Sequence, residues 1–398
     1  MQILLLVLSL GLKLFGLWFG ATALLFWKRP APIPRRAPRT RFACLIPARN
    51  EEAVIAAAVE SLRRQRYPAP LFDIYVIPNN CTDDTESAAR AAGAGIFRCF
   101  ERVTCKGDAL REAVDWLLPR GYDAFCVFDA DNLVHPDFLA RMNDALLSGA
   151  GAAKGRMAAK NPGDGPIAGC CAVYFALFET FFNRSRANLG LSAKLVGTGF
   201  AVHRRVLKRL GGWRTETIAE DAELAAQCAA MGERVLWVPE AVTYDEAPLT
   251  LRLSLRQRLR WCSGIMSAAE RWLPALLASR ACPLRRWDMA LFLCAPFAQA
   301  LSPLPAVLWG VWAWQQGALG TCFAVGAAGL LAGYGTLAVL AAVLARRAGG
   351  CAAGTVWLFP LFMASWLPLQ AVSLLHRSRV WRPIPHGRPM SARETVQV

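Results

Sequence analysis

The chain has 398 residues, enough for two or three structural units, and 55% of them are hydrophobic. Its formal net charge is +16, but the arginines gather beside apolar segments and no zinc-finger, helix-turn-helix or single-strand-binding signature accompanies them, which argues against a nucleic-acid partner. The 13 cysteines follow neither a C-x-x-C nor a disulfide-framework pattern, so we expect them to be reduced thiols.

The chain begins with an apolar segment, residues 3–27, that only Lys13 interrupts and that is long enough to span a bilayer. A linker rich in proline and arginine, residues 28–41, follows it. By the positive-inside rule, we expect residues 1–27 to anchor the protein in the cell (inner) membrane, with the amino terminus outside and the following chain in the cytoplasm. A cleaved signal peptide, the alternative, carries its positive charge before the apolar run.

Residues 42–247 alternate short apolar strands with helical stretches, which predicts an α/β domain on a doubly wound, largely parallel sheet. The expected strands are 42–47, 73–78, 96–99 and 123–128, and the expected helices are 51–65, 83–92, 106–118 and 136–148. From about residue 150 the pattern becomes mixed, with a long apolar stretch near 166–182. We interpret this part as the second half of the same domain.

Two carboxylates stand at the end of the fourth expected strand. Residues 125–128 have the continuous hydrophobicity of a strand buried on both faces, and Asp129 and Asp131 follow them, with Asn132 next. In open α/β sheets, ligands bind just beyond the carboxyl ends of the strands. Paired oxygen donors at that place suit a divalent cation that also holds substrate phosphates, although acids after a strand also occur as turn formers.

Beyond residue 247 the sequence changes character. If residues 249–271 are helical, leucines share one face with Cys262 and Met266, while arginines repeat every four residues on another, so we expect amphipathic interfacial helices over 248–287. Three apolar stretches follow within 288–376, at 288–314, 318–345 and 354–375. If all three cross the membrane from a cytoplasmic domain, the basic tail, 377–398, lies outside, against the positive-inside rule. We therefore expect one of the three stretches to be broken or re-entrant.

Several short motifs occur in a fixed order between residues 42 and 262. They are Ile46-Pro47-Ala48-Arg49-Asn50-Glu51, Asn79-Asn80-Cys81-Thr82-Asp83-Asp84-Thr85, Cys105-Lys106-Gly107, Asp129-Ala130-Asp131, Glu220-Asp221 and Gln257-Arg258-Leu259-Arg260-Trp261. The ordered set resembles the membrane-bound members of glycosyltransferase family 2, which include cellulose, hyaluronan and poly-N-acetylglucosamine synthases and ceramide glucosyltransferase. This resemblance implies a GT-A type, Rossmann-like nucleotide-sugar domain joined to transmembrane helices.

The resemblance also implies a donor site. Its expected nucleotide-sugar contacts are Pro47, Asn50, Glu51, Asn79, Asp83, Lys106 and Asp129. We expect Pro47 to end the first strand, and Asn50 and Glu51 to open a helix whose free N–H groups face the donor. Asn79 stands where the family usually has an aspartate that contacts uracil, and its carbonyl oxygen can still accept from the base.

The phosphate end of the donor site combines a lysine with the paired acids. Asp83 is expected at the start of a helix, and Lys106 in a loop leading into another, from which its ammonium reaches the pyrophosphate or the metal-bound acids. The resemblance implies that Asp129 and Asp131 hold Mg²⁺ or Mn²⁺, with Asp131 as the direct ligand. The cation neutralises charge on the departing nucleoside diphosphate.

The resemblance implies that Asp221 is the catalytic residue, a general base that takes the proton from the acceptor hydroxyl. A base on the face opposite the leaving group gives a single displacement with inversion of configuration. Thr217 lies three residues before Glu220, which is the spacing of a capping box. Glu220 is therefore either a structural cap or part of the acceptor and pyrophosphate site.

The acceptor and pyrophosphate site also includes four residues of one predicted helix. Gln257, Arg260 and Trp261 are three and four residues apart and can face one site, where Trp261 offers a flat surface to a sugar ring. Arg260 or Arg258 can hold a phosphate bidentately. Membrane anchoring by tryptophan and arginine is the alternative interpretation of the same residues.

Together, the motifs and apolar segments predict an inverting, metal-dependent hexosyltransferase with a cytoplasmic catalytic domain. The expected donor is a UDP-sugar, and the expected acceptor is a growing polysaccharide, with an oligomer or export partner as a further requirement. Formation of a glycolipid is the second reading. A silent scaffold conflicts with the intact acids, and a transporter conflicts with the few ionisable residues in the apolar segments and the absence of an inverted repeat.

Overall fold

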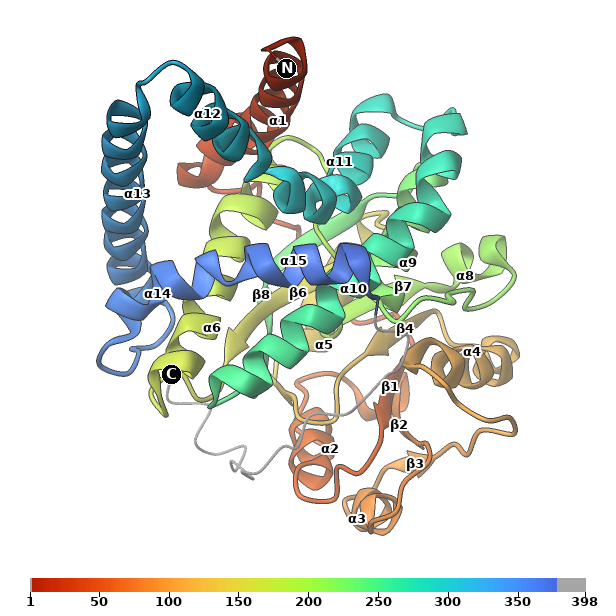
Figure 1. Cartoon of the computed structure of the whole chain (residues 1–398). Coiled ribbons are helices and arrows are strands. Elements are labelled where there is room, and N and C mark those ends of the chain that lie inside the picture. Colours follow the sequence, from red (N-terminus) through yellow and green to blue (C-terminus); the bar gives the residue numbers. More distant parts are fainter. Residues whose placement is uncertain (1, 378–398) are drawn as a thin grey trace.

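The computed structural model describes residues 2–377, so the predicted basic tail lies outside the described residues except for Arg377. A curled sheet occupies the centre and is covered by helices on both faces (Figure 1). The long apolar helices gather at one end of the molecule, away from the first three helices of the α/β domain.

Eight strands of the described chain form one mixed sheet. They are β1 (Phe42–Ala48), β2 (Phe72–Pro78), β3 (Gly95–Ile96), β4 (Ala124–Val127), β5 (Leu133–Val134), β6 (Ala152–Ala159), β7 (Phe200–His203) and β8 (Val235–Asp245). Their order is β3-β2-β1-β4-β7-β6-β8-β5. The first four in this order run parallel, as the sequence predicts, whereas β7 is antiparallel to both of its neighbours.

The helices of the α/β domain cover the sheet on both sides. They are α2 (Ile55–Arg63), α3 (Thr85–Ala91), α4 (Lys106–Leu117), α5 (Phe138–Leu147), α8 (Arg204–Leu210) and α9 (Glu220–Ala230). In β1, Ala43 and Leu45 pack with α4 and α9, and Cys44 and Ile46 pack with α2 and α5. Because both faces are buried, successive residues of the central strands must be apolar.

The first predicted helix begins later than expected. Asn50 has a φ of 58°, in the left-handed region, and the carbonyl oxygen of Glu51 accepts from the N–H groups of Val54 and Ile55 in a turn. A residue with this φ cannot continue a right-handed helix. Asn50 and Glu51 therefore lie in the loop before α2 rather than at its amino terminus, and β1 continues one residue beyond Pro47.

Five helical stretches of the described chain are long and apolar enough to span a membrane. The first is Leu6–Trp27, in α1 (Gln2–Ala23) and the turn after it, and the second is Pro166–Asn188, which consists of α6 (Pro166–Leu177), a π-helical segment (Phe178–Asn183) and α7 (Arg184–Asn188). The third is Pro283–Gln315, in α11 (Pro283–Leu301) and α12 (Leu304–Gln315), and the fourth is Leu319–Arg347, which is α13. The fifth is Thr355–Leu375, in α14 (Thr355–Ala364) and α15 (Trp366–Leu375). The sequence predicts four of them. The additional one, Pro166–Asn188, belongs to the mixed second half of the domain.

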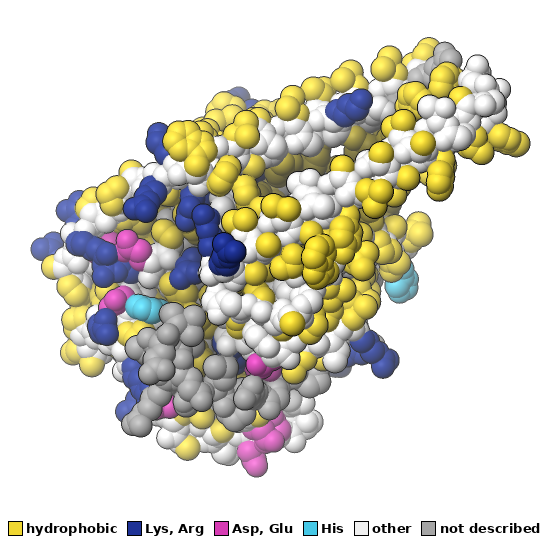
Figure 2. Space-filling view, turned by 90° about the vertical axis from the view of Figure 1, so that its left-hand side faces the viewer, with side chains coloured by type: hydrophobic (Ala, Val, Ile, Leu, Met, Phe, Trp, Pro, Cys, Tyr) yellow, Lys and Arg dark blue, Asp and Glu magenta, His cyan; other side chains and the backbone are white. Residues whose placement is uncertain are grey.

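The apolar helices present hydrophobic side chains outward. Large exposed side chains include Leu10 and Leu17 on α1 and Phe323, Leu330 and Leu331 on α13. Figure 2 shows many hydrophobic side chains over the projecting part of the molecule, with most of the visible lysines and arginines away from it. A surface of this kind is unfavourable in water, and it indicates that the protein associates with a membrane.

The interfacial helix and the last apolar stretch lie against each other. The predicted amphipathic helix is α10 (Leu251–Ala278), which packs along α11 and α15. In Figure 1, α14 and α15 run across the direction of α13, and Ser365 separates the two helices. This interruption agrees with the expectation that a proline-containing stretch is broken; the number of membrane crossings stays a prediction.

Candidate functional site

A cavity of about 710 Å³ extends from the carboxyl ends of β1 and β4 to α1. The predicted site residues that line it are Pro47, Glu51, Lys106, Asp129, Asp131, Glu220, Asp221, Gln257, Arg260 and Trp261. Four other predicted residues, Asn50, Asn79, Asp83 and Arg258, are absent from this lining. Acids from distant parts of the sequence thus face one shared space.

Asp129 and Asp221 are connected through Lys106 and the backbone of Gly197. Lys106 is the first residue of α4, and its ammonium lies 2.6 Å from Asp129 Oδ1 and also donates to the carbonyl of Gly197. The N–H of the same glycine donates to Asp221 Oδ2 at 2.5 Å. Because the N–H and the carbonyl of one residue are both held, the position of the predicted base is fixed relative to the Lys106–Asp129 pair.

Glycines allow the loop at 197–199 to lie this close. Gly199 has a φ of 63°, and a Cβ there would lie 2.7 Å from Thr243 Oγ1, so a larger residue would be strained and would clash. Between the glycines, Thr198 Oγ1 accepts from the N–H of Asp129 at 3.0 Å, and the ammonium of Lys154 donates to the Thr198 carbonyl at 2.7 Å. The loop therefore orients the backbone that carries the paired acids.

Asp131 is buried and lies beside further acidic groups. Its Oδ2 accepts from the N–H of Glu246 at 3.0 Å, and Asn132 bridges to Asp245 Oδ1 at 2.9 Å. Burial, reinforced by the charges of Asp131 and Asp129, raises the pKa of Asp245 well above its usual value, against the opposing effect of nearby lysines. This clustering of negative charge is relieved when a cation binds.

The donor set fits a divalent cation only if the substrate completes its coordination. Within residues 2–377, no group of three or more histidine, cysteine, aspartate or glutamate side chains is arranged to hold a metal ion. Asp129 is paired with Lys106, and Asp131, which accepts from the N–H of Glu246, lines the same cavity. One or two carboxylates together with phosphate oxygens and water are the usual environment of Mg²⁺.

Glu220 is not a helix cap, contrary to the capping-box expectation. The N-cap of α9 is Ala219, and the hydroxyl of Thr217 has no hydrogen-bond partner among the described residues. The backbone N–H of Thr217 instead donates to Glu223. Glu220 is directed at Lys106, with a separation of 3.2 Å, because α9 begins at the cavity rather than one turn earlier.

Burial raises the pKa of Glu220 to about 7 against the opposing charge of Lys106, and the charges of Asp221 and Asp129 add smaller contributions in the same direction as burial. A carboxyl whose pKa is raised on folding contributes stability below its unfolded value near 4.5, and this contribution disappears as pH rises through about 7. We therefore expect the melting temperature of Glu220→Gln, relative to that of wild type, to rise as the pH is raised from 5 to 8. Thermal unfolding without metal measures this, and parallel curves for the two proteins would contradict it.

Two residues that were predicted to contact the nucleotide sugar instead form hydrogen bonds between the loops after β1 and β2. Asn50 Oδ1 accepts from the N–H of Thr82 at 2.8 Å, and the Asp83 carboxylate accepts from the N–H of Glu52 at 3.1 Å. Asn79 follows β2 and is buried, and its Oδ1 has no hydrogen-bond partner among the described residues. An orphaned buried acceptor at the end of a parallel strand matches its predicted contact with a base N–H.

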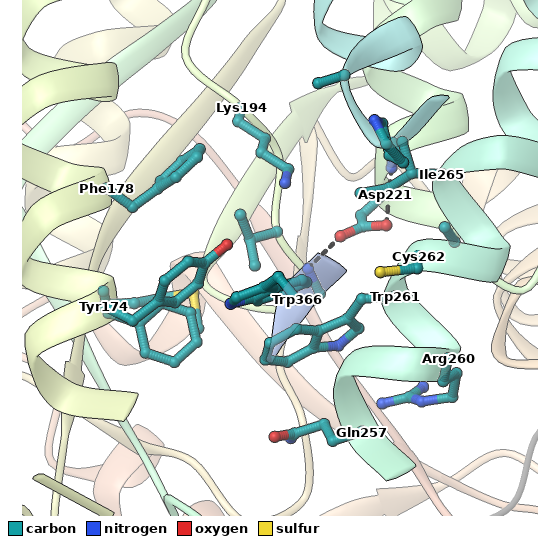
Figure 3. Close-up of a pocket in the computed structure, with 18 of the residues that line it drawn as sticks. Tyr174, Phe178, Lys194, Asp221, Gln257, Arg260, Trp261, Cys262, Ile265 and Trp366 are labelled. Carbon is teal, nitrogen blue, oxygen red and sulfur yellow. Dashed lines mark hydrogen bonds between the residues drawn. The ribbon is translucent and has the colours of Figure 1, made fainter. Parts of the chain in front are cut away.

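The far side of the cavity is aromatic. Gln257, Arg260 and Trp261 project into it from α10, and Trp366 of α15 lies between Trp261 and Tyr174 (Figure 3). The Trp366 ring centroid is 6.2 Å from that of Trp261 and 5.3 Å from that of Tyr174, with both pairs stacked. The buried Nε of Arg260 has no hydrogen-bond partner among the described residues, so a donor is left for a ligand.

Arg258 does not reach the cavity. It is fully buried, and its guanidinium donates to the carbonyl of Phe362 at 3.0 Å and to Ser365 Oγ at 2.8 Å. The same group lies 4.0 Å from the ring centroid of Phe362. Arg258 thus fixes α10 to the junction of α14 and α15 and is unsuited to hold a phosphate, which corrects its predicted role.

Lys194 is a cavity residue that sequence reasoning missed. Its ammonium points towards Asp221 in Figure 3 and lies 4.2 Å from the ring centroid of Phe292 and 5.0 Å from that of Phe178. Burial lowers the pKa of Lys194 to about 8, although the charge of Asp221 partly opposes this. No motif surrounds this lysine in the sequence, and its neighbours in space come from distant helices.

Comparisons with known proteins identify the family and the fold. The sequence profile described as "Glycosyltransferase like family 2" matches residues 38–264. The chain is 29% identical to "Probable glycosyltransferase YdaM" of Bacillus subtilis, over 55% of this chain and 54% of that protein. It is 28% identical to "Beta-monoglucosyldiacylglycerol synthase" of Nostoc sp., over 66% of this chain and 57% of that protein. The alignments therefore span little more than half the length of these relatives.

One solved structure shares the fold over nearly the whole described chain. It is the mannosyltransferase PcManGT from Pyrobaculum calidifontis, in complex with GDP-Man and Mn²⁺. The TM-score is 0.60 at 22% sequence identity, and the match covers 93% of this chain and 95% of that one. The likeness confirms the GT-A fold predicted from the sequence.

Proposed function

The chain belongs to the glycosyltransferase-like family 2, and on that premise we propose that it moves a hexose from a nucleotide sugar to an acceptor hydroxyl, forming a β-glycosidic bond. The observation that carries the proposal is the shared cavity, in which the backbone N–H and carbonyl of Gly197 connect Asp221 to the Lys106–Asp129 pair. A transferase needs such a constant separation between the group that activates the acceptor and the groups that hold the leaving diphosphate.

Asp221 serves as the general base in this proposal. One carboxylate oxygen accepts from Gly197, and the other accepts from the N–H of Ala222 at 2.7 Å, so the side chain is oriented by the backbone at the start of α9. The positive end of that helix and the ammonium of Lys194 both lie beside this carboxylate. A base that faces the acceptor across from the diphosphate supports inversion at the anomeric carbon.

The proposed donor end holds the nucleotide diphosphate and a divalent cation, Mg²⁺ or Mn²⁺. Asp131, with Asp129, would hold the cation, which when bound stabilises negative charge on the departing diphosphate. Lys106 is placed by Asp129 and Glu220 to contact phosphate oxygens, and Glu51 and Pro47 line the same end. The unpaired Oδ1 of Asn79 supports recognition of a base N–H, as in a uracil.

We favour a lipid acceptor over the polysaccharide that the sequence motifs place first. The cavity continues from Asp221 past Phe178 and Phe292 to side chains of the membrane helix α1, including Phe15 and Phe19. Apolar walls of this kind suit acyl or alkyl chains better than a hydrated polymer. The stacked indoles of Trp261 and Trp366 support the polysaccharide alternative, because sugar rings pack on such surfaces.

The proposed location is the cell membrane, with the catalytic domain in the cytoplasm. The basic linker after α1 supports this orientation by the positive-inside rule. Nucleotide sugar and membrane lipids are then both available at the same surface. An oligomer or export partner is part of the polysaccharide alternative only.

The experiment that tests the function incubates membranes containing the protein with a panel of radiolabelled nucleotide sugars, with Mg²⁺, Mn²⁺ or EDTA. We expect one donor to label an organic-extractable product when a cation is present, and EDTA to remove at least about 90% of the labelling because the acids at 129 and 131 lose their shared counter-ion. Labelled polymer in place of lipid would support the polysaccharide alternative. Protein that neither hydrolyses nor transfers any of these sugars would contradict the proposal.

A further inference from the structure

The amino-terminal helix α1 contributes one continuous face to the catalytic cavity. Leu12, Phe15, Gly16 and Phe19 all line it, and their spacing is that of one side of an α-helix. Ala295 and other residues of α11 and α15 line the same cavity. A helix that served only to attach the domain to the bilayer would not need to share a cavity with Asp221.

A buried ion pair holds α1 in this position. Trp18 Nε1 donates to Asp288 Oδ1 at 2.9 Å, and Arg186 donates to both oxygens of the same carboxylate, each at 2.9 Å. These three residues come from α1, α11 and α7, so the contact joins three apolar stretches. We refer to Trp18, Arg186 and Asp288 as the α1 lock.

The α1 lock lies directly behind the cavity wall. The Arg186 guanidinium lies 3.4 Å from the ring centroid of Phe182 and 5.4 Å from that of Phe19, and both rings line the cavity. Phe182 stacks in turn on Phe178, with ring centroids 4.6 Å apart. The lock thus supports an aromatic wall that continues from α1 towards Lys194 and Asp221.

We propose that α1 is a wall of the acceptor site and that the apolar chain of a lipid acceptor lies along it, over Gly16. The inference rests on the proposed function and specifies how a lipid is bound. The cavity has charged groups, Asp221 and Lys194, at one end and an uncharged apolar helix face at the other, so it matches an amphipathic molecule with its hydroxyl at the base. Gly16 leaves that face open, because nothing lies within 4 Å of where its Cβ would be.

Gly16→Leu and Gly11→Leu form a matched pair on the same helix. Neither position has an atom within 4 Å of an added Cβ, but only Gly16 lines the cavity. Both substitutions make α1 more apolar and more helical, so membrane attachment is preserved. Purified wild type and variants are assayed in phosphatidylcholine vesicles with dioleoylglycerol, dihexanoylglycerol or ceramide as acceptor probes, and donor hydrolysis is measured in parallel.

We expect Gly16→Leu to lower transfer to dioleoylglycerol or ceramide by about tenfold through a higher KM, with dihexanoylglycerol changed by less than about twofold. Gly11→Leu is expected to match wild type with every acceptor, and donor hydrolysis to be equal in all three proteins. A graded loss from Gly16→Ala to Gly16→Val carries the same test if the leucine variant does not accumulate.

The failures of the two proposals are distinguishable. If wild type hydrolyses the donor but labels none of the three lipids, the lipid acceptor is wrong, and the role of α1 falls with it. If lipid product forms equally well in Gly16→Leu and Gly11→Leu, transfer to lipid stands and only the role of α1 is overturned. Equal losses with the long-chain and short-chain diacylglycerols would also overturn it, because a chain-binding wall must discriminate by length.

Discussion

Replacing Asp221 with asparagine is expected to lower kcat for sugar transfer by about 10²–10⁴-fold, the usual contribution of a positioned general base. The amide has nearly the same size, and its oxygen can still accept from the N–H of Gly197, so we expect the loop at 197–199 to keep its conformation. The amide NH2 cannot accept from the N–H of Ala222, and that hydrogen bond is lost. The amide cannot take a proton from the acceptor. Product formation under saturating donor measures the loss, and calorimetric titration with the nucleotide and Mn²⁺ is expected to give an affinity close to that of wild type.

Asp131→Asn provides the contrasting variant. Asp131 follows β4 and lines the same cavity as the predicted base, so its replacement is expected to weaken nucleotide binding only when the cation is present. Wild type and Asp131→Asn should bind the nucleotide alike in EDTA. Normal turnover in Asp221→Asn would refute the base assignment, and equal loss of binding in both variants would mean that the two acids form one structural cluster without separate roles.

The position of the paired acids at one edge of the sheet could be predicted from the sequence because it follows from local rules. Asp129 and Asp131 follow a short apolar run, and an apolar run of that length is a central strand when both faces are covered. Parallel neighbours then bring the ends of β1, β2 and β4 to one edge without further information. The same reasoning misplaced Asn50, because a left-handed residue in a loop leaves no signal in hydrophobic periodicity.

The acceptor side could be predicted only in part, because side-chain direction on α10 is decided by helices far away in the sequence. The sequence pattern alone makes Arg258 and Arg260 equally good candidates to bind a phosphate. The contact of Arg258 with Phe362 and Ser365 turns it inward, and Arg260 remains in the cavity. Helical spacing restricts which residues share a face but does not say which partner covers that face.

Tyr174, Trp366 and the lining residues of α1 were missed for a different reason. Their side chains are apolar or aromatic. Trp366 and α1 belong to stretches predicted as membrane helices, and Tyr174 belongs to an apolar stretch interpreted as part of the α/β domain. Such residues show no chemical signature until tertiary contacts place them beside the catalytic acids. The interpretation of residues 1–27 as an anchor is therefore incomplete, since one face of α1 lines the catalytic cavity.

The second large effect is expected at the α1 lock. Asp288→Ala leaves the Arg186 guanidinium, which is 1% exposed, buried without its carboxylate, and is expected to lower the free energy of unfolding by about 3–5 kcal/mol. Trp18→Phe removes one hydrogen bond while the ion pair remains, so we expect the free energy of unfolding to fall by about 1 kcal/mol. The three proteins are heated in detergent and then analysed by size-exclusion chromatography, and the loss of the monodisperse peak with temperature ranks their stabilities.

The double variant Arg186→Met with Asp288→Leu separates the charge from the packing. Removing both charges leaves no unpaired ion, so its stability is expected to return most of the way to wild type. The long apolar side chain at 186 can still cover the ring of Phe182, which keeps the aromatic wall in place. If Asp288→Ala melts with wild type, water or lipid must already reach Arg186, and α1 cannot depend on this carboxylate for its position. If the double variant is as unstable as Asp288→Ala, the geometry of the pair rather than its charge balance holds the three helices together.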